Sequence, residues 1–313
     1  MKKFVSAVVI MLAAVLFISS THAQKPPSKE ELLKQIATLS STNKPEDSAK
    51  AYAVAKDYLA RFGKDTDSNT AKVKVYADNY RHNQFFVQLD AKKYIDAFAI
   101  GREILAEQPA NLDVLMNLAY AGYALSGTPE MATYTNEAIS DSRRSLQLLE
   151  AGTVPKSFAP FADKNDVTAY MYFIDGSLSM DKEPAGAAGN IYKATLIESQ
   201  IKNEPLAYYL IATYYEGVYA KLSADLKAKA AAKTISDDDT KKAMAKINET
   251  IDLMMDAYAR TCKRAEATKN PNYATWKARL DQVYKFRRGS DAGLAEFVSL
   301  TNSSPLPDPS KFH

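Results

Sequence analysis

Residues 92–125 read KKYIDAFAIGREILAEQPANLDVLMNLAYAGYAL, and the fold can be inferred most directly from this stretch. Apolar residues recur at three- and four-residue intervals on both sides of Gln108–Asn111, which is the spacing of one face of an α-helix. Pro109 lies in the middle of the interruption, where a proline favours a turn. The stretch therefore predicts the second helix of one helical hairpin, a tight turn at 108–111, and the first helix of the next hairpin.

The same helical spacing extends over most of the chain. Ser28-Lys29-Glu30-Glu31 has the pattern of a capping box, which predicts that a helix begins there. Glycine is scarce, at 11 of 313 residues, and alternating β-branched residues are rare, so the composition favours helices over sheets. The predicted helices are 28–40, 46–62, 70–90, 93–107, 111–126, 129–151, 166–180, 185–202, 205–230, 238–267, 271–287 and 291–301. Most joints between them are short, as expected for antiparallel neighbours.

The first residues have the pattern of a secretory signal peptide, predicted at 1–23. Two lysines follow Met1, an apolar run extends from Phe4 to Ile18, and Thr21-His22-Ala23 matches a small-residue cleavage site. The alternative is an uncleaved membrane anchor, but the run is shorter than the roughly 20 apolar residues that a spanning helix needs. We therefore expect a periplasmic or secreted protein without a membrane span after cleavage.

The net charge of the chain argues against a nucleic-acid partner. The formal net charge of the chain is +3, and Lys2 and Lys3 lie in the predicted signal, which leaves a nearly balanced mature chain. A balanced charge provides no global attraction for nucleic acid. We expect no nucleic-acid partner, and the sequence leaves the oligomeric state open.

The longest interruption in the helical pattern lies at residues 151–164 and contains two prolines and two phenylalanines. We expect it to separate N-terminal helical hairpins (24–151) from a C-terminal helical half (165–301). The phenylalanines indicate that this segment packs on the protein surface. The Pro- and Ser-rich residues 302–313 are expected to form a loose, flexible tail.

The residues around the turn at Pro109 also match a known repeat. Small and large residues recur at the family's spacing, with Tyr94 and Ala97 before the turn and Leu115, Leu118 and Ala119 after it. On these residues the chain resembles the tetratricopeptide repeat, although Gly101, Ile104 and Gly122 depart from its pattern. The clear match covers about a tenth of the chain, and the spacing of later turns is irregular. An ordinary helical bundle would share the same periodicity.

The resemblance implies an α-α superhelix of stacked antiparallel helical hairpins with irregular repeats. In the family, the first helix of each hairpin lines a concave binding face. Asp113 would lie near the rim of that face. The residues that the family register would place at this groove are Asn79, His82, Asn83, Phe86, Asn117, Tyr120 and Tyr123.

Side chains of this kind suit an extended peptide, although Phe86, Tyr120 and Tyr123 could equally be core residues. The family's carboxylate clamp is not expected, because His82, Phe86 and Asp113 stand where its basic and amide residues would be.

Catalytic patterns do not stand out in the sequence. Its three histidines are His22, His82 and His313, and there is no phosphate-binding loop, G-x-S-x-G or H-E-x-x-H. We expect a protein that is not an enzyme and needs no cofactor or metal. A hydrolase that uses carboxylates alone remains a third hypothesis.

Cys262 is the only cysteine, so no internal disulfide can form. We interpret it as a buried structural thiol. The alternative is a reactive thiol whose pKa is lowered by Arg260, Lys263 and Arg264.

Tyrosines are frequent, and several fall on one face of the predicted helix 205–230. Tyr208, Tyr215 and Tyr219 share that face, with Tyr209 beside it. They fit core packing, or else a platform for stacking sugars or peptides. The first functional hypothesis is an exported, non-catalytic scaffold that binds a protein or peptide partner in the cell envelope. The alternative is a glycan- or small-molecule-binding protein of the same fold.

Overall fold

The computed structural model describes residues 26–42, 44–129, 131–301 and 304–312. Within these ranges the chain is helical and contains no β-strand, which confirms the all-α prediction. The predicted signal peptide, 1–23, lies outside the described residues.

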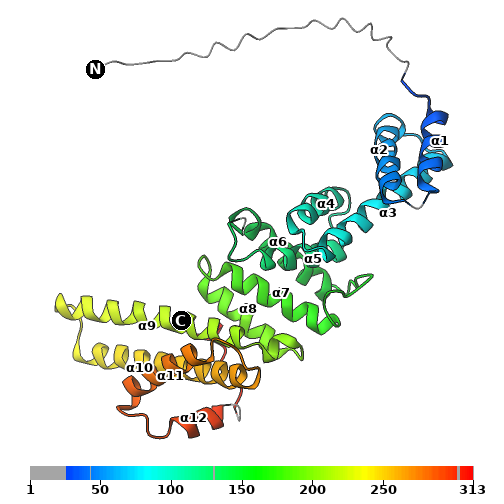
Figure 1. The fold of residues 1–313 in the computed structure, drawn as a ribbon. Helices are drawn as coiled ribbons and strands as arrows, with labels where there is room; N and C mark the ends of the chain where they lie inside the picture. The colour runs from blue at the N-terminus through cyan, green and yellow to red at the C-terminus, as the bar shows by residue number, and fades with distance from the viewer. Residues whose placement is uncertain (1–25, 43, 130, 302–303, 313) are drawn as a thin grey trace, which may run out of the picture. The chain divides into compact units, whose positions relative to one another are not determined.

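Twelve α-helices follow one another in the described ranges (Figure 1). They are α1 (Lys29–Ser40), α2 (Pro45–Phe62), α3 (Ser68–Asp90), α4 (Tyr94–Glu107), α5 (Leu112–Ala124), α6 (Met131–Glu150), α7 (Lys164–Ser179), α8 (Pro184–Leu196), α9 (Pro205–Ala231), α10 (Asp237–Ala267), α11 (Tyr273–Arg288) and α12 (Leu294–Leu300). Short 3-10 helices η1 (Gln200–Asn203) and η3 (Pro309–Lys311) are also present. Each predicted helix is found to within a few residues, except that 185–202 ends at Leu196.

Local signals account for several helix starts. Ser28 accepts a hydrogen bond from the Glu31 amide (3.2 Å), and its own amide donates to the Glu31 carboxylate (2.6 Å). This reciprocal pair is the predicted capping box at the start of α1. At α5, the Asn111 side chain accepts from the Val114 amide (3.2 Å). The turn after Pro109 is therefore followed at once by a capped helix.

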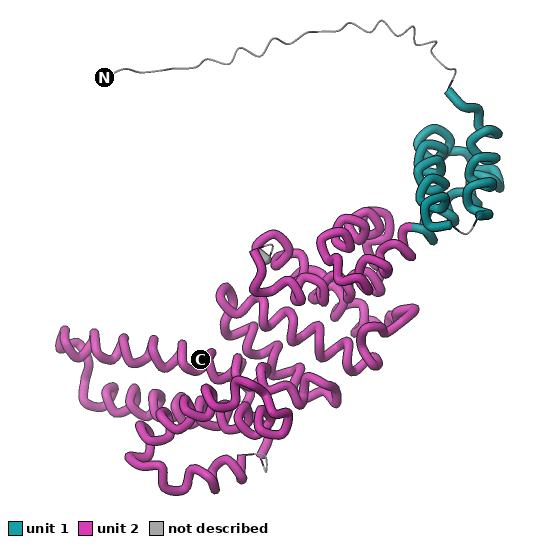
Figure 2. The backbone as a smooth tube through the Cα atoms, in the orientation of Figure 1, with its two compact units in different colours: residues 1–80 teal, residues 81–313 magenta. Residues whose placement is uncertain are grey.

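The chain divides into two compact units, Met1–Tyr80 and Arg81–His313, and α3 runs through the division (Figure 2). In the first unit, α1, α2 and the first part of α3 surround one small core. Leu32 and Ile36 from α1 meet Tyr58 of α2 and Val73 of α3 there. The Tyr58 hydroxyl pairs with the Thr70 hydroxyl (3.0 Å), so the buried polar atom is satisfied.

In the second unit each helix from α4 to α10 packs against the next one in the chain. Helix α5 also contacts α7, and α10 contacts α12. The helices thus pack in consecutive pairs, which is compatible with a helical-repeat arrangement. At Gly122, where the repeat pattern has an aromatic residue, an added Cβ would lie 2.5 Å from the Ala138 Cβ. The close approach of α5 and α6 therefore requires glycine at this departure from the family pattern.

The segment 151–164 does not separate the two units, contrary to our expectation for the domain boundary. Its backbone amides at Lys156 and Ser157 donate to the Asp113 carboxylate (3.1 and 3.0 Å). Phe161 is buried in the core formed by α5, α6 and α7. This segment packs on the surface of one continuous unit, because its aromatic side chain has an apolar site there.

The last described residues also differ from the expected loose tail. Leu306 is 6% exposed, and Pro309 is buried. Arg260 Nη2 donates to the Ser304 carbonyl (2.9 Å). Phe312 packs against the core of the C-terminal helices. Residues 304–312, which we call the strap, are held by buried apolar side chains and a buried arginine.

Candidate functional site

The predicted groove residues lie on α3 and α5, and the structure gives them unequal exposure. Asn79 and Asn83 on α3 are exposed. His82 is partly buried, and its Nε2 accepts from Asn111 Nδ2 (3.0 Å). Phe86 is partly buried against Phe85, with ring centroids 5.2 Å apart. Of the four predicted groove residues on α3, only the two asparagines are therefore fully exposed.

The α5 residues are covered. Asn117 is 4% exposed, and its Nδ2 donates to the carbonyls of Asp113 (2.8 Å) and Ala159 (3.3 Å). The segment 151–164 therefore satisfies the amide that was expected to bind a peptide backbone. Tyr120 packs edge-on against Phe161, and Tyr123 packs edge-on against Phe173. Burial raises the pKa of Tyr123 to about 12. In this structure Asn117 is buried, and Tyr120 and Tyr123 are partly buried against the core.

A cleft of about 730 Å³ lies elsewhere, along α9. Tyr214, Gly217, Val218 and Leu222 line one wall and share a helix face, because they recur at three- and four-residue spacing. Met180 and Asp181 of the turn between α7 and α8 also line the cleft, together with Pro184 and Ala185 at the start of α8. Lys246 of α10 and Phe312 of the strap complete the lining. The volume falls in the range typical of ligand sites, about 300–1,000 Å³.

Gly217 keeps the cleft open in its middle. A Cβ at this position would have no atom within 4 Å. Neither backbone strain nor tight packing requires glycine here, so a larger residue would simply project into the cleft. This glycine, within the apolar face of α9, is the signal in the sequence that could have indicated the site, and the tyrosine pattern of residues 205–230 did not point to it.

Charged groups lie around an apolar interior. Lys221, Lys246 and Asp181 line the cleft, and none of the three forms an ion pair with another described residue. With two ammonium groups and one carboxylate, the charged residues of this lining have a net positive charge. An acidic group on a ligand could therefore pair with Lys221 or Lys246 there.

A backbone carbonyl is already bound in the cleft. The Tyr214 hydroxyl donates to the Phe312 carbonyl oxygen (3.3 Å). The ammonium group of Lys246 lies 5.4 Å from the centroid of the Phe312 ring. The cleft thus holds one aromatic residue by its ring and by its main chain together, which is a peptide-like contact.

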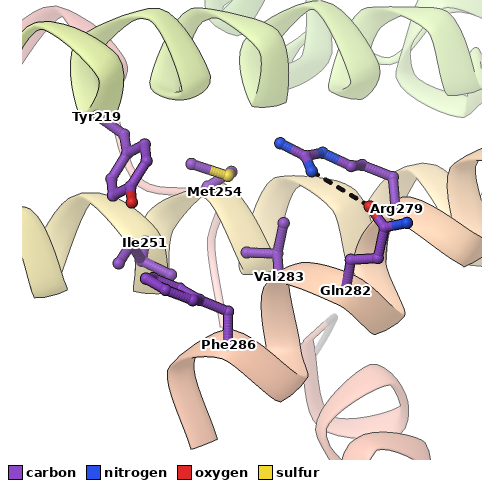
Figure 3. A pocket seen from close by; sticks show the side chains of 7 residues that line it. All are labelled: Tyr219, Ile251, Met254, Arg279, Gln282, Val283 and Phe286. Carbon is purple, nitrogen blue, oxygen red and sulfur yellow. Dashed lines mark hydrogen bonds between the residues drawn. The ribbon is translucent and has the colours of Figure 1, made fainter.

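A second, smaller pocket of about 230 Å³ lies between α9, α10 and α11 (Figure 3). Tyr219, Ile251, Met254, Val283 and Phe286 supply its apolar surface. Phe286 is 69% exposed, and its ring centroid lies 6.3 Å from that of Tyr219.

Arg279 and Gln282, two polar residues of this smaller pocket, already form hydrogen bonds. Arg279 donates to Gln282 (3.3 Å), which is the dashed line in Figure 3. Its Nε donates to Glu216 (2.6 Å), which also accepts from the Tyr258 hydroxyl (2.9 Å). A ligand would have to compete with these hydrogen bonds.

Other candidate residues from the sequence have structural roles. Tyr208 and Tyr215 are buried, and Tyr209 stacks on Trp276 at 5.2 Å between centroids. Core packing therefore accounts for these three, while Tyr219 alone reaches a pocket. Cys262 is 2% exposed, and burial raises the pKa of its thiol to about 12. The interpretation as a buried structural thiol agrees with this, and the lowered pKa of the alternative does not.

The described residues hold no group of three or more His, Cys, Asp or Glu side chains placed to bind a metal ion. Among the helices of the described ranges, none combines the length and apolar character of a membrane span.

Comparison with known proteins identifies no relative. No protein-family model matches the chain, and neither the curated proteins nor the solved structures contain a match.

Proposed function

We propose that this chain is an exported, non-catalytic, tetratricopeptide-like scaffold that binds an extended segment of a protein partner in the cell envelope. The observation that carries the proposal is the cleft along α9, where Tyr214 binds a backbone carbonyl next to an apolar wall. The export component rests on the pattern of residues 1–23. The repeat component rests on the resemblance around Pro109 and on the packing of consecutive helices.

The lining of the cleft defines the partner's chemistry. Val218 and Leu222 favour an aliphatic or aromatic side chain as the anchor, since apolar burial drives most peptide docking. Lys221 and Lys246 favour an acidic residue next to that anchor. The binding site proposed from the structure is thus the α9 cleft, whereas the sequence suggested a groove on α3 and α5.

The test uses a displayed library of random peptides, selected on the purified protein and then measured by fluorescence polarisation. The blocking variant is Gly217→Leu, which projects a side chain into the cleft without meeting other atoms at its Cβ. Gly186→Leu is the matched control on α8, because its Cβ also meets nothing within 4 Å and it does not line the cleft. Selected peptides should bind Gly217→Leu at least tenfold more weakly and bind the control as they bind the wild type.

Equal binding of the selected peptides to both glycine variants would refute the cleft as the peptide site. The charge of the rim provides a second measurement. Lys221→Glu combined with Lys246→Glu should weaken acidic peptides more than neutral ones, and raising the salt concentration should reduce that difference.

A glycan- or small-molecule-binding protein of the same fold is the second candidate. The observation that favours it is the Tyr219–Phe286 pocket, where aromatic rings lie near Arg279 and Gln282. Thermal-shift measurements with oligosaccharides distinguish the candidates, because a ligand that binds the folded state raises the melting temperature. A shift that Phe286→Ala abolishes, in a protein that selects no peptides, would favour this candidate.

A further inference from the structure

The strap, residues 304–312, is anchored firmly at its first part. Arg260, itself 4% exposed, donates to the Ser304 carbonyl (2.9 Å). Leu306 and Pro309 are buried. Ser310 lies directly on α8, where a Cβ added at Gly189 would come within 3.2 Å of the Ser310 Cβ. These contacts fix the course of the strap across α8 and α10.

The far end of the strap is held by fewer contacts. Phe312 is only partly buried, and its ring meets Tyr215 edge-on, with 5.9 Å between centroids. The Tyr214 hydroxyl bond to its carbonyl is long for a hydrogen bond between oxygens, at 3.3 Å. The Lys246 ammonium lies 5.4 Å from the ring centroid. Because no side chain of the strap beyond Pro309 is fully buried, this end can move while the anchor stays in place.

Phe312 also lies at the junction of two hollows. Phe312 and Lys246 line the α9 cleft, and both also line a shallower hollow shared with Lys242, Glu249 and Lys311. Moving the Phe312 ring would join the two hollows along α10. Moving the whole residue would also free the Tyr214 hydroxyl from the Phe312 carbonyl and uncover the apolar surface of Tyr215. The ring therefore covers the surface that a longer peptide would need.

We propose that the strap is an internal ligand of the cleft. Phe312 occupies the position of the partner's aromatic residue, and the partner binds by displacing Phe312 while the anchor at Leu306 and Pro309 stays. This inference rests on the proposed function, since it names the partner's recognition residue and the regulation of the same site. The partner's segment carries an aromatic side chain and a backbone carbonyl that accepts from Tyr214.

The first experiment needs no external ligand. Hydrogen exchange is measured at the amides of Lys311 and Phe312, which donate to the Asp308 (3.3 Å) and Pro309 (3.2 Å) carbonyls. Tyr214→Phe should accelerate exchange at these two amides at least threefold and leave α10 unchanged. Unchanged exchange at both amides would show that the hydroxyl does not hold the strap, and would overturn the proposal.

The second experiment supplies the strap in trans. A labelled synthetic peptide with the sequence of residues 304–312 is added to the wild type and to a variant with Leu306→Asp and Phe312→Asp, whose own strap is released. The peptide should bind the released variant at least tenfold more tightly than the wild type. Equal affinity, or no binding to a released variant with native circular dichroism, contradicts an internal ligand. If the released variant does not fold, Phe312→Ala replaces it, with the same expected direction.

The third measurement separates this inference from the proposed function. Peptides selected on the protein should bind Phe312→Ala at least fivefold more tightly than the wild type, and their binding should accelerate exchange at Phe312. Peptides that lose affinity for Gly217→Leu but bind Phe312→Ala like the wild type would overturn only the displacement of the strap. Equal binding of the selected peptides to Gly217→Leu and Gly186→Leu would overturn the proposed function. The binding of the strap peptide in the second experiment would then still test the internal ligand by itself.

Discussion

Asp175 and Asp141, on neighbouring helices, show how hydrogen-bond partners affect a carboxylate that is buried or partly buried. Asp175 of α7 accepts from Arg143 (2.9 Å) and from Asn190 (2.8 Å), so its charge is compensated although burial raises its pKa. Within the described part of the chain, the Asp141 carboxylate of α6 accepts no such bond. Burial, with repulsion from Glu137, raises the pKa of Asp141 to about 7, and Arg102 opposes this only weakly because it pairs with Glu137 (2.8 Å).

Replacing Asp141 with Asn should stabilise the protein above neutral pH. The pKa of Asp141 in the folded state, about 7, lies above its unfolded value, so the wild type loses stability as pH rises from about 4 to 7. Asp141→Asn should therefore gain up to about 4 kcal/mol in the free energy of unfolding at pH 8 and almost nothing near pH 4, because one pKa unit corresponds to about 1.4 kcal/mol. Urea unfolding across this range measures the difference.

Asp225→Asn is the control, because Asp225 forms an exposed ion pair with Lys229. It should change stability by less than about 0.5 kcal/mol. A gain for Asp141→Asn that is the same at pH 5 and pH 8 would contradict the assigned pKa.

At the scale of elements, the hairpin of α7 and α8 depends on a close helix crossing. A Cβ added at Gly176 would lie 2.5 Å from Ile191 Cγ1 and 2.6 Å from the Ala187 carbonyl oxygen. The backbone of α8 therefore occupies the space that any side chain at Gly176 would need. This crossing also brings Asn190 to Asp175, so the hydrogen bond and the packing support the same helix pair.

Gly176→Ala should destabilise the protein by about 2–3 kcal/mol, because the backbone carbonyl of α8 cannot move aside without separating the helices. The matched control is Gly186→Ala in α8, whose Cβ meets nothing within 4 Å. It should be neutral or stabilising by up to about 1 kcal/mol, since alanine favours a helix over glycine. Urea unfolding of both variants measures the contrast. Similar effects of the two substitutions would show that the crossing is not close.

At the scale of the whole molecule, the two compact units have separate cores. Tyr58 lies fully buried in the core of α1, α2 and the first part of α3, and Tyr258 lies in the core of the C-terminal helices. In stacked helical proteins, stability is approximately a sum of local terms and neighbour interactions. We therefore expect the effect of a core substitution to remain largely in its own unit.

Tyr58→Ala should remove about 3–5 kcal/mol of local stability, because it leaves a cavity the size of an aromatic ring. Hydrogen exchange should accelerate in residues 29–80 and stay unchanged in α9 and α10, where the cleft lies. Tyr258→Ala should show the reverse pattern. Acceleration spread equally over both units in either variant would indicate one cooperative structure.

Much of the fold can be predicted because helix signals are local. The capping box at Ser28, the turn at Pro109 and the three- to four-residue apolar spacing each involve neighbours within a turn or two of helix. Such signals predict the helices and their order. They cannot predict that Asn117 is buried, because its amide donates to the carbonyl of Ala159, 42 residues further along the chain.

The candidate site also could not be predicted from local sequence signals. Its lining combines the turn between α7 and α8, one face of α9, Lys246 of α10 and Phe312. Tyr214 and Phe312 are 98 residues apart in the chain, and no local pattern links them. The amino-acid pattern alone therefore established an all-helical chain of successive hairpins. The location of the cleft, the burial of Asn117 and the docking of the strap followed only from tertiary packing, because contacts between distant segments place these side chains together.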